Sequence, residues 1–457
     1  MLKAVIKAFG IPDLRRRILF TLGVLVIFRF IAHVPVAGIG QGVRDALQGF
    51  LSGDPTQAPA GSTPGVGGVL GFLDIFSGGS LSNFSIAAAG VYPYVTASII
   101  IQLLTPIIPA FERMQKEGQR GRERLNRYTH IITVPIAALT AYGHLVLLKS
   151  QGILTSSNGG DRFSLFGAGS DPLLTIAAVT AMTAGTVVLV WLGELITEYG
   201  IGSGVSIIIF GGIVSGFPQR VAQAGKSGIG QNLVSIAIVI IVGLAAVVGI
   251  VLVQEGQRKI PVRFPRQMQG NKVYGGQQTH IPLKVNSAGM IPLIFASSII
   301  IFPATVAGFF IRPSNPDDWV SKAATWVVTN FGTGSGLYQI LYFAMVLGFT
   351  YFYTMVLFNQ QNITESLRDR GGFIPGFRPG KPTNDYLMKV LVRITLIGAI
   401  FLGVIAILPF LLGLIVQAQV QTFLNSTSIL IVVGVAVDTM KQLEAQLVMR
   451  EYQGILR

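Results

Sequence analysis

Long uninterrupted apolar runs constrain this chain more than any other feature of its sequence. A helix needs roughly 20 apolar residues to cross the hydrocarbon core of a bilayer. Seven runs reach or approach that length, at 18–38, 131–148, 173–192, 233–253, 288–311, 337–358 and 390–412. Three more are shorter or carry more polar residues, at 86–105, 205–217 and 427–437. With 51% hydrophobic and 12% charged residues, the sequence predicts an all-α polytopic membrane protein with ten transmembrane helices.

The positions of lysine and arginine support this count. Positive charge collects in cytoplasmic loops, and ten spans would leave both termini on one side of the membrane. The segments on that side hold 26 of the 34 Lys and Arg residues, so we expect both termini to be cytoplasmic. The net charge of +14 is then mainly a topology signal rather than a sign of nucleic-acid binding.

The spans divide five and five, which suggests two pseudo-symmetric halves, residues 1–225 and 226–457. The second half carries two long inner loops, 255–285 and 359–389. In the first of these loops, charged and apolar residues alternate between turn residues, as is typical of a hairpin. In the second, the stretch FIPGFRPGKPTNDY, residues 373–386, holds three prolines and two glycines, so we expect a stiff loop and no helix there.

A short apolar segment, Val69–Phe76, lies between glycine pairs at 67–68 and 78–79. As a helix it would cover only about 12 Å, too little to cross a bilayer. It is therefore either a helix packed on the outer surface or a small re-entrant stopper with glycine hinges.

Few ionisable residues fall within the spans, which disfavours an ion-coupled carrier. Arg29 is one of them, and we expect it to be paired or to reach the membrane interface. The span at 86–105 carries Pro93 and several polar side chains. These side chains either join helices by hydrogen bonds or line a conduit.

The sequence carries no recognisable catalytic or metal-binding motif. It has no cysteine, and its four histidines share no metal-ligand spacing. We therefore expect no enzyme activity, no metal and no cofactor. An apolar conduit with stiff, basic inner loops suits the docking of another macromolecule. A secondary transporter for a small solute and a non-transporting membrane scaffold are the alternatives.

Four long stretches closely resemble the SecY family, the channel subunits of bacterial protein translocases. They are SGGSLSNFSIAAAGVYPYVTASIIIQLL, WLGELITEYGIGSGVSIIIFGGIVSGFP, THIPLKVNSAGMIPLIFASSIIIFPAT and FIPGFRPGKPT. The resemblance implies a protein-conducting channel in the bacterial plasma (inner) membrane, which passes unfolded polypeptides and releases transmembrane segments sideways into lipid. It implies opening by a partner and a signal sequence. The implied partners are the SecE and SecG membrane subunits, the SecA ATPase, the ribosome, secretory preproteins, nascent membrane proteins and the lipid bilayer.

The resemblance also implies roles for individual residues. The implied pore ring consists of Val91, Val95, Val205, Ile209, Ile294 and Ile431. The resemblance implies a short re-entrant plug helix at about 66–77, and the implied plug residues are Val69, Leu70, Phe72, Leu73, Ile75 and Phe76. The implied lateral gate includes Thr96, Gln102 and Asn286, with Thr140 at a position where a longer amide is expected. The implied partner-binding residues are Arg378, as the principal contact, with Gly380, Arg258 and Lys259.

Overall fold

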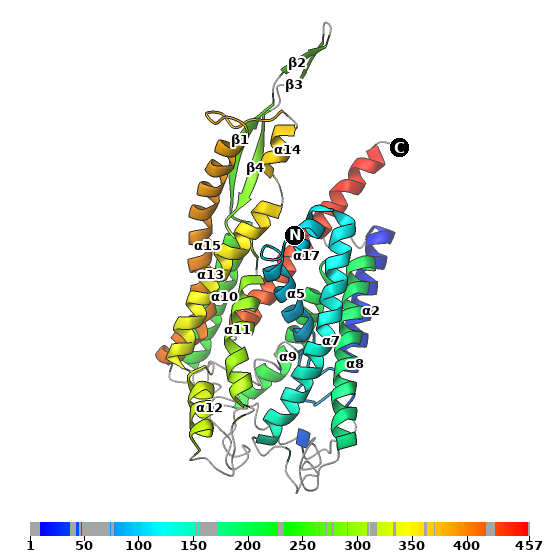
Figure 1. Ribbon diagram of the computed structural model, residues 1–457, viewed down its shortest axis with the longest axis vertical. Helices are drawn as coiled ribbons and strands as arrows, with labels where there is room; N and C mark the ends of the chain where they lie inside the picture. The colour runs from blue at the N-terminus through cyan, green and yellow to red at the C-terminus, as the bar shows by residue number, and fades with distance from the viewer. Residues whose placement is uncertain are drawn as a thin grey trace. The chain divides into compact units, whose positions relative to one another are not determined.

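The computed structural model describes most of the helical part of the chain. The described residues are 10–36, 43–44, 47, 74, 77–150, 154, 172–226, 233–264, 266–269, 272–275, 278–289, 291–308, 310, 318–331, 335–360, 363–369, 371–416 and 426–455. Within these ranges the chain is mainly helical, with two short β ribbons (Figure 1).

Each of the ten predicted spans overlaps a helix. These helices are α2 (Pro12–Ile31), α5 (Tyr92–Leu104), α7 (Gln119–Ser150), α8 (Pro172–Tyr199), α9 (Gly204–Lys226), α10 (Leu233–Glu255), α11 (Ile291–Gly308), α13 (Gly336–Gln360), α15 (Lys381–Val416) and α17 (Ser426–Ile455). Among the described residues, three further helices lie between them, α6 (Pro109–Lys116), α12 (Trp319–Asn330) and α14 (Ile363–Asp369). The apolar runs therefore located the main helices correctly.

Not all of these helices are both long enough and apolar enough to cross a membrane. Among the described residues, four helices are long and apolar enough to cross a membrane, at Gln119–Lys149, Pro172–Tyr199, Gly336–Asp369 and Lys381–Leu408. The helices α5 and α6 would form a fifth span if their 97° bend lies within one crossing. Ten crossings therefore remain a prediction.

One expectation about the inner loop 359–389 was wrong in part. We expected no helix over residues 373–386, but α15 begins at Lys381. Pro382 is its second residue, where a proline is tolerated because the missing backbone N–H would have no partner in the helix anyway. Only the part of the stretch before Lys381 is non-helical.

The chain forms two compact units. The first comprises Met1–Gln231, Ser298–Tyr338 and Val435–Arg457, and the second comprises Asn232–Ser297 and Gln339–Gly434. The predicted pseudo-symmetric halves, divided at residue 225, concern internal symmetry and remain a prediction.

In the first unit, α8 is the central helix. It packs against α2, α7 and α9, and α5 packs against α7 (Figure 1). The contact between α8 and α9 depends on Gly204, because a Cβ added there would lie 1.7 Å from the carbonyl oxygen of Gly193. Small residues at helix contacts let the backbones approach closely, as is usual for helices in a membrane.

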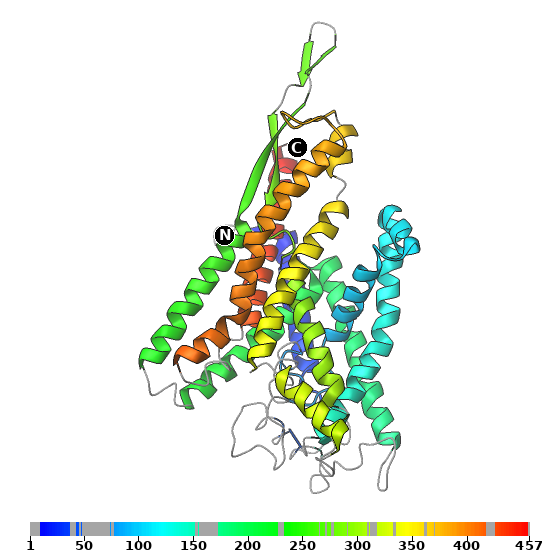
Figure 2. The same cartoon turned by 60° about the vertical axis from the view of Figure 1, so that its left-hand side comes forward.

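In the second unit, the inner loop after α10 forms a hairpin, as the sequence predicted. The strands β1 (Gln257–Arg263) and β4 (Gln278–Lys284) pair antiparallel, with Gln257 opposite Lys284 and Arg263 opposite Gln278. Beyond them, β2 (Arg266–Gln269) pairs with β3 (Lys272–Gly275). Figure 2 shows the β2–β3 pair, drawn in green, extending beyond α15 and α14.

A hydrophobic cluster, here called the inner cluster, joins this ribbon to the neighbouring helices. Residues 260 and 262 of β1 point into it, as the alternation of a strand requires. Its buried members are Ile260, Val262, Leu283, Phe358, Ile374, Leu387, Val390, Leu391 and Ile394. The ribbon, the end of α13, the stiff loop and the start of α15 thus share one core.

The close contact between α8 and α9 gives a first prediction. The substitution Gly204→Ala should destabilise the protein by about 1–3 kcal/mol, because the new methyl group meets backbone that cannot rotate away. Gly348→Ala in α13 is the control, since nothing lies within 4 Å of a Cβ there. Thermal unfolding in detergent measures both. Equal melting temperatures would contradict the contact.

The inner cluster gives a second prediction. Ile374→Ala should cost about 2–5 kcal/mol, because it leaves a cavity among packed side chains. The loop around it should then be cleaved faster by chymotrypsin at the Phe377–Arg378 bond. Phe373→Ala is the matched control, because Phe373 is 37% exposed whereas Ile374 is 3% exposed. Similar cleavage rates for the two variants would show that Ile374 does not anchor the loop.

Candidate functional site

The described non-helical residues directly before α15, 371–380, include the first part of the predicted docking stretch and are here called the stiff loop. Three of its glycines have left-handed backbone angles, with φ of 70° at Gly371, 91° at Gly376 and 108° at Gly380. Side chains other than glycine are strained in this conformation. The three glycines therefore allow the loop backbone to adopt these angles without strain.

The stiff loop is attached to the β ribbon by its backbone. Arg263 and Phe373 exchange two hydrogen bonds, each 2.9 Å long, so that the loop forms an isolated antiparallel bridge with β1. Next to this bridge, Ile374 is buried in the inner cluster. The start of the loop is thus fixed by paired backbone groups and by burial.

The end of the loop is fixed by the first two turns of α15. The rings of Phe377 and Tyr386 are stacked with centroids 4.1 Å apart. The hydroxyl of Thr383 donates a hydrogen bond of 2.7 Å to the carbonyl oxygen of Arg378. The Arg378 residue itself is exposed, so a fixed backbone presents its guanidinium to water.

The other two predicted partner contacts lie further back on the ribbon. Arg258 and Lys259 are both exposed on β1. As neighbours in a strand, they point to opposite faces of the ribbon. Arg258 lies five residues before Arg263, roughly 17 Å along the strand. Arg258 and Lys259 therefore face different surroundings on the ribbon.

Four predicted ring residues lie in the first unit. Val91 immediately precedes α5 and Val95 lies one turn later, while Val205 and Ile209 are one turn apart at the start of α9. Residues four apart share a helix face. Val91 and Ile209 are 1% and 3% exposed. Each helix start therefore carries a pair of aliphatic side chains on one face.

The remaining two ring residues lie in the second unit. Ile294 is on α11 and Ile431 is on α17, and they are 8% and 1% exposed. The six residues thus lie on or immediately before four different helices, as expected. Their meeting in one ring remains a prediction.

The predicted lateral-gate residues make local hydrogen bonds. The hydroxyl of Thr96 donates to the carbonyl of Tyr92 at 3.0 Å, and the amide of Gln102 donates to Ser98 Oγ at 3.0 Å. The Asn286 amide donates to the carbonyl of Gly289 at 3.0 Å. Among the described residues, Asn286 Oδ1 is buried without a partner. That oxygen can accept a further hydrogen bond.

Thr140, which lies where the predicted gate cluster would have a longer amide, also makes a local hydrogen bond. Its hydroxyl donates to the carbonyl of Ile136 at 2.8 Å, within α7. The residues predicted for the cluster therefore each have a local bond, and a bonded cluster between them remains a prediction.

The predicted plug residues, Val69, Leu70, Phe72, Leu73, Ile75 and Phe76, lie outside the described residues. The segment that follows them is described. There Arg29 Nη1 donates a hydrogen bond of 2.8 Å to the carbonyl oxygen of Gly78. Arg29 is therefore paired, which confirms the expectation. A charge inside a span signalled the need for a partner, but no sequence signal identified Gly78.

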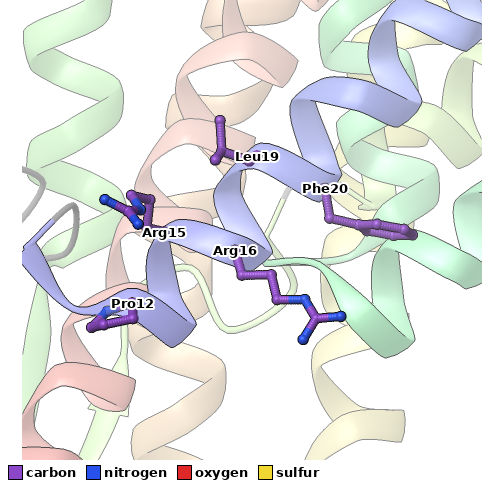
Figure 3. Close-up of a pocket in the computed structure, with 5 residues that line it drawn as sticks. All are labelled: Pro12, Arg15, Arg16, Leu19 and Phe20. Carbon is purple, nitrogen blue, oxygen red and sulfur yellow. The ribbon is translucent and has the colours of Figure 1, made fainter.

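A shallow pocket lies at the N-terminal end of α2. It is lined by Pro12, Arg15, Arg16, Leu19 and Phe20. In Figure 3 the guanidinium groups of Arg15 and Arg16 point away from each other along the helix. Cationic side chains next to apolar ones suit the boundary between lipid head groups and hydrocarbon.

The described residues contain no group of three or more His, Cys, Asp or Glu side chains placed to hold a metal ion.

Comparisons with known proteins identify the family. A model of the SecY family matches residues 85–440. The chain is 41% identical to the protein translocase subunit SecY of Streptomyces griseus, over the full length of both chains. It is 40% identical to that of Thermotoga maritima, covering 100% of this chain and 98% of the relative.

Solved structures show the same fold. A protein-conducting channel has a TM-score of 0.58 at 18% identity, covering 95% of this chain and 93% of the other. Sec61 in a canine ribosome–channel complex from the endoplasmic reticulum has a TM-score of 0.57 at 18% identity, with the same coverage. With these full-length relatives and this fold, the multi-pass membrane chain belongs to the SecY family, the pore-forming subunits of protein translocation channels.

Proposed function

We propose that the chain passes unfolded polypeptides across the bacterial plasma membrane and releases transmembrane segments sideways into lipid. A docked SecA ATPase or ribosome, together with a signal sequence, opens it. The observation that carries this proposal is the exposed Arg378 on a loop whose backbone is fixed at both ends. Full-length similarity to translocase subunits speaks against a small-solute carrier or a scaffold.

The stiff loop has the properties of a docking site. A segment that is already ordered loses less conformational entropy on binding than a flexible one. Its arginine can bind either RNA phosphate or protein carboxylates through two parallel hydrogen bonds. Arg378 thus suits both a ribosome and a motor protein. The ribosome complex of the canine relative supports the first of these partners.

The predicted pore ring suits a channel with many different clients. Aliphatic side chains offer neither charge nor fixed hydrogen bonds, so they bind no passing segment strongly. All six ring residues are aliphatic. A narrow apolar ring can also limit ion leakage while a chain occupies the pore.

The charges support the proposed orientation and surroundings. Both termini are cytoplasmic in this proposal, and Arg15 and Arg16 at the start of α2 would then face the inner head groups. SecE and SecG are the proposed membrane partners. The chain itself would catalyse no reaction, and the energy for transport would come from its partners.

The docking proposal predicts the effect of reversing one charge. Arg378→Glu should abolish SecA-driven transport, because the new carboxylate repels the groups that bound the arginine. Folding should be unaffected, since the side chain is exposed. Arg368→Glu is the control, because Arg368 is exposed on the neighbouring helix α14. Preprotein translocation into vesicles measures both variants. Normal transport by Arg378→Glu would refute the docking role.

The ring proposal predicts the effect of polar substitution. In a dry core, Asn at several of these positions would cost about 1–3 kcal/mol each, because buried amides would lack partners. In a conduit, water satisfies the new amides. Val91→Asn combined with Ile431→Asn should therefore leave accumulation and export intact and raise ion conductance in planar bilayers.

Leu189→Asn is the matched control for the ring substitutions. Leu189 is fully buried in α8 and is not a ring residue. This variant should lose folded protein without any gain in conductance. The same outcome for the ring variant would show that Val91 and Ile431 are ordinary core residues.

A further inference from the structure

The segment that follows the predicted plug, residues 77–86, is here called the stem. It is made of turns rather than helix, and it begins with Gly78 and Gly79, whose φ angles are 70° and 79°. Flexible glycines in this position suggested a hinge. The contacts of the stem show instead that it is fixed.

The first fixed point is a contact between two glycine backbones. A Cβ added to Gly78 would lie 2.7 Å from the Cα of Gly212 on α9, and a Cβ added to Gly212 would lie 2.6 Å from the Cα of Gly78. The ring of Phe28 closes the same site, 2.9 Å from the Cβ position of Gly78. Only glycine fits at both positions, because each side meets backbone.

The second fixed point is Arg29. Its guanidinium donates to the carbonyl of Gly78 at 2.8 Å and lies 3.8 Å from the Cβ position of Gly79. A charged side chain within a span is costly unless it is paired or hydrated. The glycine turn gives Arg29 a hydrogen-bond acceptor, and Arg29 holds the turn.

The end of the stem is fixed as well. The amide of Val36 donates to the carbonyl of Phe84 at 3.1 Å, and the amide of Ile86 donates to the carbonyl of Val34 at 3.0 Å. A Cβ added to Gly185 on α8 would lie 2.0 Å from the carbonyl oxygen of Ile86. The stem is thus held by α8, α9, the end of α2 and the residues that follow it.

We propose that Arg29 and the Gly78–Gly212 contact form a latch that fixes the base of the plug and holds the channel closed at rest. Arg29 is then a positioning residue of the seal, and the glycine pair is an anchor rather than a hinge. This inference rests on the proposed channel function. In this proposal, the contacts between α2, α9 and the stem maintain the closed state of the channel.

The test uses labelling and conductance together. The chain has no cysteine, so Ser80→Cys in the stem introduces one thiol at a position that is 0% exposed. In vesicles, a water-soluble maleimide should label it slowly in the parent. Loss of a charge-assisted hydrogen bond shifts an equilibrium by roughly ten- to a hundredfold. Arg29→Gln should therefore raise the labelling rate by about that factor and make the resting channel leak ions.

Matched variants separate the latch from general damage. Gly212→Ala should have the same effects as Arg29→Gln, because its methyl group pushes against the backbone of Gly78. Gly211→Ala should match the parent, because its methyl group meets only the tip of the Leu25 side chain, at 2.7 Å. Arg29→Lys, which keeps the charge, should restore much of the protection.

Two outcomes would overturn the latch. Parent-like labelling and conductance in both Arg29→Gln and Gly212→Ala would show that these contacts do not hold the resting state. Loss of folded protein in both would show that the stem is part of the folding core. Preprotein transport by the parent tests the channel function separately, so failure there would not be mistaken for failure of the latch.

Discussion

The pairing of backbone polar groups is the constraint on which the rest of this structure depends. In hydrocarbon no water is present to bond an exposed N–H or C=O, so a chain of apolar runs must fold into helices. The stem between α2 and α5 is not helical. Its backbone is paired through turns, as in the bonds from Gly79 to Asp74 and from Ser85 to Ser80. Non-helical backbone is tolerated there because the protein surrounds and pairs it.

Glycine contacts then determine how closely the elements of the first unit approach one another. Gly193 with Gly204, and Gly78 with Gly212, bring backbone directly against backbone. Such contacts replace the hydrophobic driving force, which is weak between helices in lipid. They also leave little room for adjustment, because backbone cannot rotate away as a side chain can. The helices α8 and α9 with the stem therefore form a tightly packed frame.

The inner side of the second unit follows different rules, because water can solvate its loops. Its order comes from the inner cluster and from the bridge between Arg263 and Phe373. The stiff loop continues directly into the first turn of α15, and the ribbon continues from the end of α10. A partner bound at Arg378 would thus pull on two elements that run on into apolar helices.

The sequence by itself determined the positions of the main helices and the hairpin at 255–285. These features depend on local hydrophobicity and on short-range alternation, which can be read one segment at a time. The family resemblance predicted roles for Arg378 and for the ring residues, and these roles stay predictions.

Only the tertiary structure showed that Gly78 accepts the hydrogen bond of Arg29 and that Phe373 pairs with Arg263. It also showed that α15 begins at Lys381, inside the stretch that was expected to be non-helical, because Pro382 in a first helical turn costs no hydrogen bond. Each long-range contact joins residues far apart in the chain. Their partners are selected by packing and by the need to satisfy buried polar groups, which no single segment of sequence encodes.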